Sequence, residues 1–113
     1  MPQFAVVVHA PAPADPMALS SEDLAALEQY GQQVSDLGGK VVTGFALAPS
    51  TTARSIRGDE VIDGPLGDGA LVVSGYFVLD APDPDVALEI ARLNPATRDG
   101  AVEVRPLFEP PTG

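Results

Sequence analysis

Asp63-Gly64-Pro65-Leu66 and Gly100-Ala101-Val102-Glu103-Val104-Arg105-Pro106 are the two stretches that decide the fold. The first is a glycine-proline turn. In the second, valines alternate with charged residues, which is typical of a strand with one buried face. Between the two stretches lie a strand-like segment and a helix with a clear start and end. The chain therefore closes as strand, helix, strand.

The segment between these stretches can be read in more detail. Leu71 to Leu79 is the longest apolar run, and its valines and the internal Gly75 favour a central strand over a helix. The next helix begins at Asp83, a capping residue type, with Pro84 at the first helical position. Asn94-Pro95 ends it. We expect its buried face to consist of Val86, Ala87, Ile90, Ala91 and Leu93.

The amino-terminal half begins with a strand and a helix. Phe4 to Val8 is a short apolar run that predicts a buried strand, and the proline-rich segment Ala10 to Leu19 predicts a loop. Ser20 and Asp23 then form a capping-box pair that opens a helix, which Gly38-Gly39 ends. The helix carries one apolar stripe, which we expect to be buried: Leu24, Leu27, Tyr30 or Gly31, Val34 and Leu37.

Three further strand segments lie in the middle of the chain. Lys40 to Leu47 and Thr52 to Arg57 have the composition of strands. Gly58-Asp59 is a turn signal, after which Glu60 to Ile62 can return as a short hairpin arm. The element order is that of a split βαβ arrangement, so we predict an α+β fold with both helices on one face of an antiparallel sheet.

The other face of this sheet also carries apolar residues, because the run from Leu71 to Leu79 is nearly unbroken. Such a face needs a cover, and a second copy of the same sheet supplies it. We therefore expect a homodimer with its sheets face to face. The length of 113 residues predicts a single domain over 1–113, with a core of about 3–109 and a loose tail over 110–113.

Composition and charge exclude several classes of function. The formal net charge is -10, from 16 acidic and 6 basic residues, which disfavours direct nucleic-acid binding. Without cysteine there are no disulfides or thiolate sites, and with one histidine we expect no dedicated metal site. We see no leader-like segment and no run long enough to span a membrane. We therefore expect a cytoplasmic protein that needs no cofactor.

From Phe4 to Glu109 the chain resembles the YCII-related family, and within it the branch named for an Asp-Gly-Pro-Phe (DGPF) motif. The resemblance rests on the order and spacing of several pieces rather than on any one of them. These are a first strand ending at His9, then Gly44, Arg54, Asp63-Gly64-Pro65-Leu66, Gly75 to Asp80, Ala87 to Ala91, and Val102 to Pro106.

The resemblance implies a ferredoxin-like fold in a dimeric α+β barrel. The family has no established reaction, although a His and Asp pair has been suggested as the catalytic centre of its founding branch. This chain departs from the branch in two places. Leu66 stands where the motif has Phe, and Gly67 to Leu71 replaces a polar stretch of Glu, Thr, Lys and Glu. Polar groups that would line the family's cleft are therefore largely missing.

Asp63 and His9 are the candidate catalytic residues. Asp63 has a structural alternative, in which its side chain reaches the amide two residues on and caps its own turn. Its functional alternative is a general base or a ligand anchor. His9, at the end of the first strand, is either a half-exposed loop residue or the partner of Asp63. In such a pair the carboxylate would fix the tautomer and raise the imidazole pKa.

Arg54 is the candidate ligand-binding cation, together with Gly64, Pro65 and Leu66 of the turn. Its guanidinium either binds a carboxylate or phosphate in two-point fashion or forms an ion pair within the acidic surface. We expect Glu103 and Arg105 to pair with each other or across strands.

Three functions remain open. The first is binding of a small-molecule ligand in a cleft near Asp63, and the second is cofactor-independent acid–base catalysis by Asp63 and His9. The third is a regulatory role, because the resemblance implies genes beside those of extracytoplasmic-function sigma factors. A structural dimer with a relict site is the fallback. The missing polar groups after Leu66 favour binding over catalysis.

Overall fold

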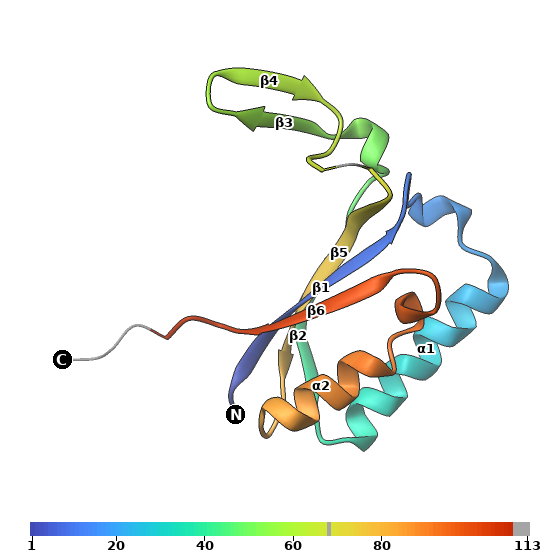
Figure 1. Cartoon of the computed structure of the whole chain (residues 1–113). Coiled ribbons are helices and arrows are strands. Elements are labelled where there is room, and N and C mark those ends of the chain that lie inside the picture. Colours follow the sequence, from blue (N-terminus) through green and yellow to red (C-terminus); the bar gives the residue numbers. More distant parts are fainter. Residues whose placement is uncertain (68, 110–113) are drawn as a thin grey trace.

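The computed structural model describes residues 1–67 and 69–109. Within this part of the chain, four strands form an antiparallel sheet in the order β2-β5-β1-β6 (Figure 1). They are β1 (Gln3–Pro11), β2 (Lys40–Ala46), β5 (Leu71–Asp80) and β6 (Ala101–Pro106). The helices are α1 (Ser21–Asp36) and α2 (Pro84–Arg92). The predicted α+β class and the central place of β5 are confirmed.

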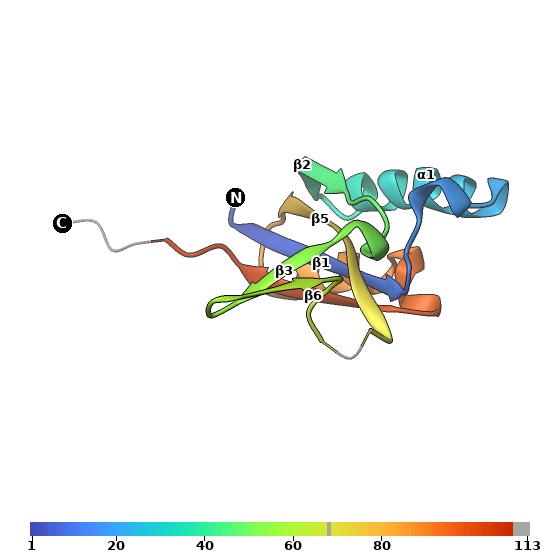
Figure 2. The same cartoon turned by 90° about the horizontal axis from the view of Figure 1, so that it is seen from above.

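The core lies between one face of this sheet and the two helices. Alternation along β1 puts Phe4 and Val6 on that face, and Leu79 of β5 pairs with Phe4. Tyr30 and Val34 of α1, with Ala87 and Ile90 of α2, pack against these strands. Val102 and Val104 of β6 are half-buried on the same side, whereas Glu103 and Arg105 are exposed. In the view of Figure 2, α1 runs along the same side of the molecule as β2.

Both helices begin as predicted. At α1, the Ser20 hydroxyl accepts from the Asp23 amide at 3.1 Å, and the Asp23 carboxylate accepts from the Ser20 amide at 3.0 Å. At α2, the Asp83 carboxylate accepts from the Val86 amide at 2.9 Å, with Pro84 at the first helical position. Each cap satisfies amides that the helix itself leaves without a partner.

The first strand is longer than Phe4–Val8. It continues to Pro11, which pairs with Leu71, so the expected loop starts later and holds a short 3-10 helix at Pro16–Ala18. Proline is tolerated there because β6 pairs with β1 only as far as His9. Beyond His9, β1 has only β5 as a neighbouring strand. A residue without an N–H can therefore stand there without removing a hydrogen bond to β6.

Part of the expected helix faces is not buried. Leu24 and Leu27 are 56% and 43% exposed, and Leu93 at the end of α2 is 40% exposed. Tyr30 and Val34, further along the same stripe of α1, are buried. The amino-terminal half of α1 therefore lies away from the sheet, and only the half after Tyr30 packs against it.

The hairpin of β3 (Arg54–Arg57) and β4 (Glu60–Asp63) forms its own two-stranded sheet. It projects from one end of the main sheet (Figure 1). The strand expected over Thr52–Arg57 is shorter, because Ser50–Thr52 forms a 3-10 helix. The tail expected over 110–113 lies outside the described residues. No helix in the described part is long and apolar enough to cross a membrane.

Candidate functional site

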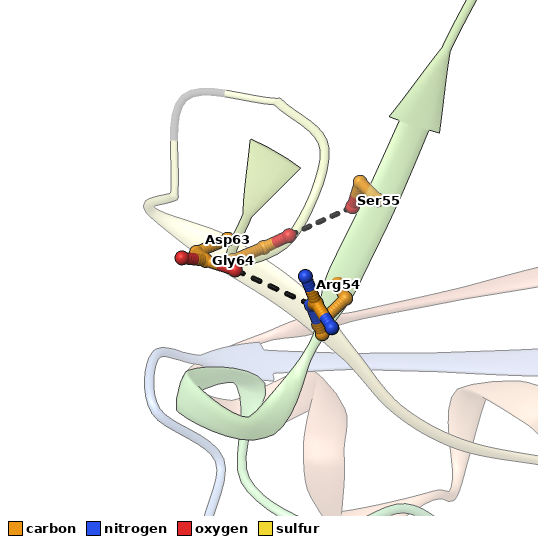
Figure 3. A network of polar contacts seen from close by, with 4 residues as sticks. All are labelled: Arg54, Ser55, Asp63 and Gly64. Atoms are coloured by element: carbon orange, nitrogen blue, oxygen red, sulfur yellow. Dashed lines mark hydrogen bonds and ion pairs between the residues drawn. The ribbon is translucent and has the colours of Figure 1, made fainter. Parts of the chain in front are cut away.

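The turn Asp63–Leu66 is held against β3 by backbone geometry. Gly64 has φ +113°, a conformation that favours glycine. Its amide donates to the Ala53 carbonyl at 2.8 Å, and its carbonyl accepts from the Ser55 hydroxyl at 2.7 Å (Figure 3). These two bonds fold the turn back along β3, so that Pro65 and Leu66 return to the body of the protein.

Pro65 and Leu66 line a groove of about 480 Å³ at the base of the hairpin, which we name the hairpin groove. Its other walls come from the end of β1, the start of β5 and the segment 47–55. Its polar side chains include His9 and Ser55, while Leu66, Leu71 and Val73 provide apolar surface. The structure thus brings together His9, Pro65 and Leu66 from distant parts of the sequence.

His9 faces this groove because side chains alternate along β1, which puts His9 on the face opposite Val8. On β5 the register shifts at Ser74, so that His9 pairs with Val73 while Val8 pairs with Gly75. A Cβ at Gly100 would clash with the carbonyl of His9, so only glycine fits there. The prediction that the first strand ends at His9 is wrong, because β1 continues to Pro11; His9 is half-buried within the strand and lines the hairpin groove.

Asp63 and Arg54 lie outside the lining of the hairpin groove and pair with each other. Arg54 Nε lies 3.3 Å from Asp63 Oδ1, and the side chains are 73% and 91% exposed (Figure 3). The ion-pair interpretation of Arg54 is therefore confirmed. The capping interpretation of Asp63 is wrong, because the residue two positions on is Pro65, which has no N–H. Among the described residues, no hydrogen bond joins Asp63 to His9.

Two groups away from the hairpin groove have perturbed acidity. Hydrogen bonds from the backbone and then the side chain of Ser20 lower the pKa of Asp23. Burial raises the pKa of Tyr30, and a hydrogen bond with Asn94 partly opposes that rise. On β6, the expected pair forms, with Arg105 Nε donating to Glu103 Oε2. In the described ranges, no group of three or more His, Cys, Asp or Glu side chains is placed to hold a metal ion.

Ser55 is a groove residue that the sequence did not indicate. A lone serine on a short strand carries no signal, and its role depends on Gly64 lying opposite. The sequence does show that Ser55 and Arg54 alternate along β3, so that their side chains lie on opposite faces of the strand.

These features define a small α+β sheet protein with a groove where a hairpin leaves the main sheet. Residues 6–110 match the model of the YCII-related domain, and the chain therefore belongs to the YCII-related family.

The comparisons with individual proteins give an uncharacterized relative and a solved structure of low similarity. An uncharacterized protein of Rhizobium meliloti (strain 1021) is 35% identical over 77 aligned residues, which cover 61% of this chain and 60% of that protein. The chain thus spans about three-fifths of this relative's length. A crystal structure from Burkholderia cenocepacia, provisionally assigned as an amidohydrolase/peptidase, aligns with 95% of this chain and 27% of that one. The identity is 19% and the TM-score 0.39, so this likeness carries no argument.

Proposed function

We propose that this YCII-related protein binds a small-molecule ligand in the hairpin groove, beside Asp63. The observation that carries the proposal is the convergence of His9, Pro65 and Leu66 on one groove of about 480 Å³. Pockets of a few hundred Å³ with apolar walls and a few polar groups are typical of small-molecule sites.

The walls and rim of the groove suggest the chemistry of this ligand. Leu66, Leu71 and Val73 offer apolar contact, while His9 and Ser55 offer hydrogen bonds. Beyond the lining, Arg54 uses Nε toward Asp63 and is 73% exposed, so its other N–H groups face solvent. A planar guanidinium suits a carboxylate or a phosphate. We propose a compact ligand with an apolar part in the groove and an anionic group near Arg54.

Ligand binding is preferred to acid–base catalysis on geometric grounds. A His–Asp pair needs the carboxylate within hydrogen-bonding distance of the imidazole. In the described part of the chain Asp63 instead pairs with Arg54, at 3.3 Å. Asp63 is also 91% exposed, and water screens the interactions that would tune a catalytic carboxylate.

A homodimer is part of the same proposal. Phe45, Tyr76 and Val73 are 58%, 43% and 42% exposed, and the alternation of β1, β2 and β5 places them on the face away from the helices. Phe45 and Tyr76 stack with ring centroids 5.7 Å apart. We propose that a second copy covers this face, with the strand order β2-β5-β1-β6 serving as the ferredoxin-like half of a dimeric α+β barrel. A cytoplasmic location and membership of the DGPF branch belong to this proposal.

The dimer has a direct test with a matched control. Phe45→Asp should shift the mass measured by light scattering from dimer to monomer, because it places a charge in an apolar interface. Leu88→Asp is the control, since Leu88 is 55% exposed but lies on α2, on the opposite side of the sheet. A monomeric wild-type protein at micromolar concentration, or equal effects of both variants, would refute the proposed interface.

The ligand site is tested by a thermal-shift screen against small acids, amines, sugars and nucleotides. A ligand of the folded state raises the melting temperature. A hit in the hairpin groove should be weakened in both His9→Ala and Arg54→Gln, which remove a groove side chain and the cation proposed to meet the anionic group, but not in Asp59→Asn, an exposed carboxylate at the tip of the hairpin. Full retention in both site variants contradicts the site. No hit in any class would contradict the proposal and favour a protein partner, such as a sigma factor.

A further inference from the structure

A second concave surface lies on the other side of the sheet. The amino-terminal half of α1 lies away from β1 and β5, and a groove of about 750 Å³ runs between them. We name it the helix groove; its walls include Leu27, Gly31, Val8, Gly75 and Phe77. It shares no lining residue with the hairpin groove, because Val8 and His9 alternate across the sheet. Its volume falls within the range of small-molecule pockets.

Small residues on both walls keep the helix groove open. On the sheet wall, a Cβ at Gly44 would lie 2.8 Å from Phe77 Cβ, and one at Gly75 would lie 2.6 Å from the Phe45 carbonyl. The sheet therefore cannot carry side chains at these two positions. On the helix wall, a Cβ at Gly31 would have no atom within 4 Å. A larger side chain at Gly31 would therefore meet no steric clash, and the glycine leaves that space empty.

The inner end of the helix groove is rigid. Tyr30 is 6% exposed, and its hydroxyl donates to the Ile90 carbonyl at 2.9 Å. The ring of Phe77 lies edge-on to Tyr30, with centroids 6.4 Å apart. Asn94 is 5% exposed, and its side chain accepts from the Ala96 amide at 2.9 Å. A pocket whose inner side chains are already fixed loses little conformational entropy when a ligand enters.

The charges on the helix groove have one sign. Asp15, Asp23 and Asp99 are among its lining residues, and no Lys, Arg or His is found among the described residues that line it. Arg98 lowers the pKa of Asp23, but this is the smallest of four influences on that carboxyl group. Asp15 and Asp23 each also cap a helix start, whereas Asp99 ends the 3-10 helix at Pro95–Arg98 through its backbone amide, and in the described part its side chain makes no hydrogen bond or ion pair.

We propose that the helix groove is a second ligand site, and that its ligand is an organic amine with an apolar body. The aryl or alkyl body lies against Leu27, Val8 and Phe77, and the protonated amine stays at the rim beside the carboxylates of Asp15, Asp23 and Asp99. The same charges weaken the binding of a ligand that carries a carboxylate. This inference does not depend on a ligand in the hairpin groove.

The test is an amide NMR titration of the full chain at low salt, with phenylbutylamine as probe and phenylbutyrate as its anionic counterpart. The amine should cause saturable shifts at the amides of Gly31, Gly44 and Gly75. The carboxylate should bind at least about tenfold more weakly, from the sum of three screened charge interactions. Equal binding of the two probes overturns the inference, and so does binding of neither at millimolar concentration.

Matched variants locate the site. Gly31→Leu should fill the groove and abolish the shifts, whereas Ala25→Leu, on an exposed part of the same helix, should leave them. If Gly31→Leu does not fold, Asp99→Asn provides the test instead. This variant should weaken binding of the amine probe several-fold, whereas Asp59→Asn should leave that binding unchanged. Unchanged binding in Asp99→Asn or in folded Gly31→Leu overturns the site. Shifts confined to the amides of His9 and Leu66 would also overturn the helix-groove site, and they would support a ligand site in the hairpin groove instead.

Discussion

Replacing Tyr30 by Phe removes one hydroxyl group and tests how α1 is joined to α2. The hydroxyl donates to the Ile90 carbonyl at 2.9 Å, a contact between residues 60 positions apart. A buried hydrogen bond contributes a net of about 0.5–1.5 kcal/mol. The Ile90 carbonyl also accepts from the Leu93 amide at 3.2 Å, so this acceptor keeps a partner, but the variant also removes the hydrogen bond between the Tyr30 hydroxyl and the buried Asn94 side chain. We therefore expect Tyr30→Phe to lower the free energy of unfolding by about 1 kcal/mol or more.

Urea unfolding measures this loss. With a slope of about 1–3 kcal/mol per molar urea, the midpoint should fall by about 0.3–1 M, with little change in slope. Tyr76→Phe is the matched control, because Tyr76 is 43% exposed and its hydroxyl has no hydrogen bond within the described ranges. The control should unfold like the wild type. Equal midpoints for the two variants would refute the inferred role of the Tyr30 hydroxyl.

The same substitution has a signature at high pH. Burial raises the pKa of Tyr30 above its ordinary value of 10.0. Between that value and the folded pKa, the unfolded chain has lost the Tyr30 proton while the folded protein keeps it, so the unfolded state gains stability. Wild-type stability should therefore fall as pH rises above 10.0, and Tyr30→Phe should lack this contribution. The gap between wild type and variant should narrow there; a constant gap would contradict the burial of the phenol.

Three other substitutions test local geometry. Asp23→Asn should flatten the loss of thermal stability in acid, because the capping hydrogen bonds lower the pKa of Asp23 below its usual 3.8 and the wild type loses this stabilisation as pH falls through that region. Gly75→Ala should lower the free energy of unfolding measured in urea by more than about 1 kcal/mol, because its Cβ would lie 2.6 Å from the Phe45 carbonyl. Gly31→Ala, the control, should raise the free energy of unfolding by up to about 1 kcal/mol, because Gly31 is a helix residue with open space around it. Asp63→Asn should change the free energy of unfolding measured in urea by less than about 1 kcal/mol, because its ion pair is solvent-exposed.

The elements that the sequence predicts well are those governed by neighbouring residues. Ser20 with Asp23, and Asp83 with Pro84, set the helix starts through contacts within three positions. The alternation of Val102 and Val104 with charged residues sets the faces of β6 in the same local way. These interactions form whatever the rest of the fold does, so a pattern in one short window is enough to predict them.

The predictions that fail depend on distances between elements. Leu24 and Leu27 have the spacing of a buried stripe, yet they are about half exposed because the amino-terminal half of α1 diverges from the sheet. Whether that stripe reaches the sheet depends on the course of the whole helix, which the spacing within α1 does not determine. Likewise, His9 and Leu66 line one groove although they lie far apart in the sequence. The spacing of apolar residues within one helix or strand does not indicate where two separate elements come into contact.

The motif turn can be divided into a part that holds the fold and a part that does not. Gly64 accounts for the shape of the turn through its positive φ, the hydrogen bond from its amide to the Ala53 carbonyl, and the hydrogen bond that its carbonyl accepts from the Ser55 hydroxyl. Asp63 adds only an ion pair with Arg54, in which both side chains are mostly exposed, and pairs of this kind contribute little to stability. The Asp63 carboxylate and the Arg54 guanidinium can therefore form further hydrogen bonds, which no group in the described part of the chain makes with them. Both stand beside the hairpin groove, so the ligand that we propose for that groove would lie within reach of them.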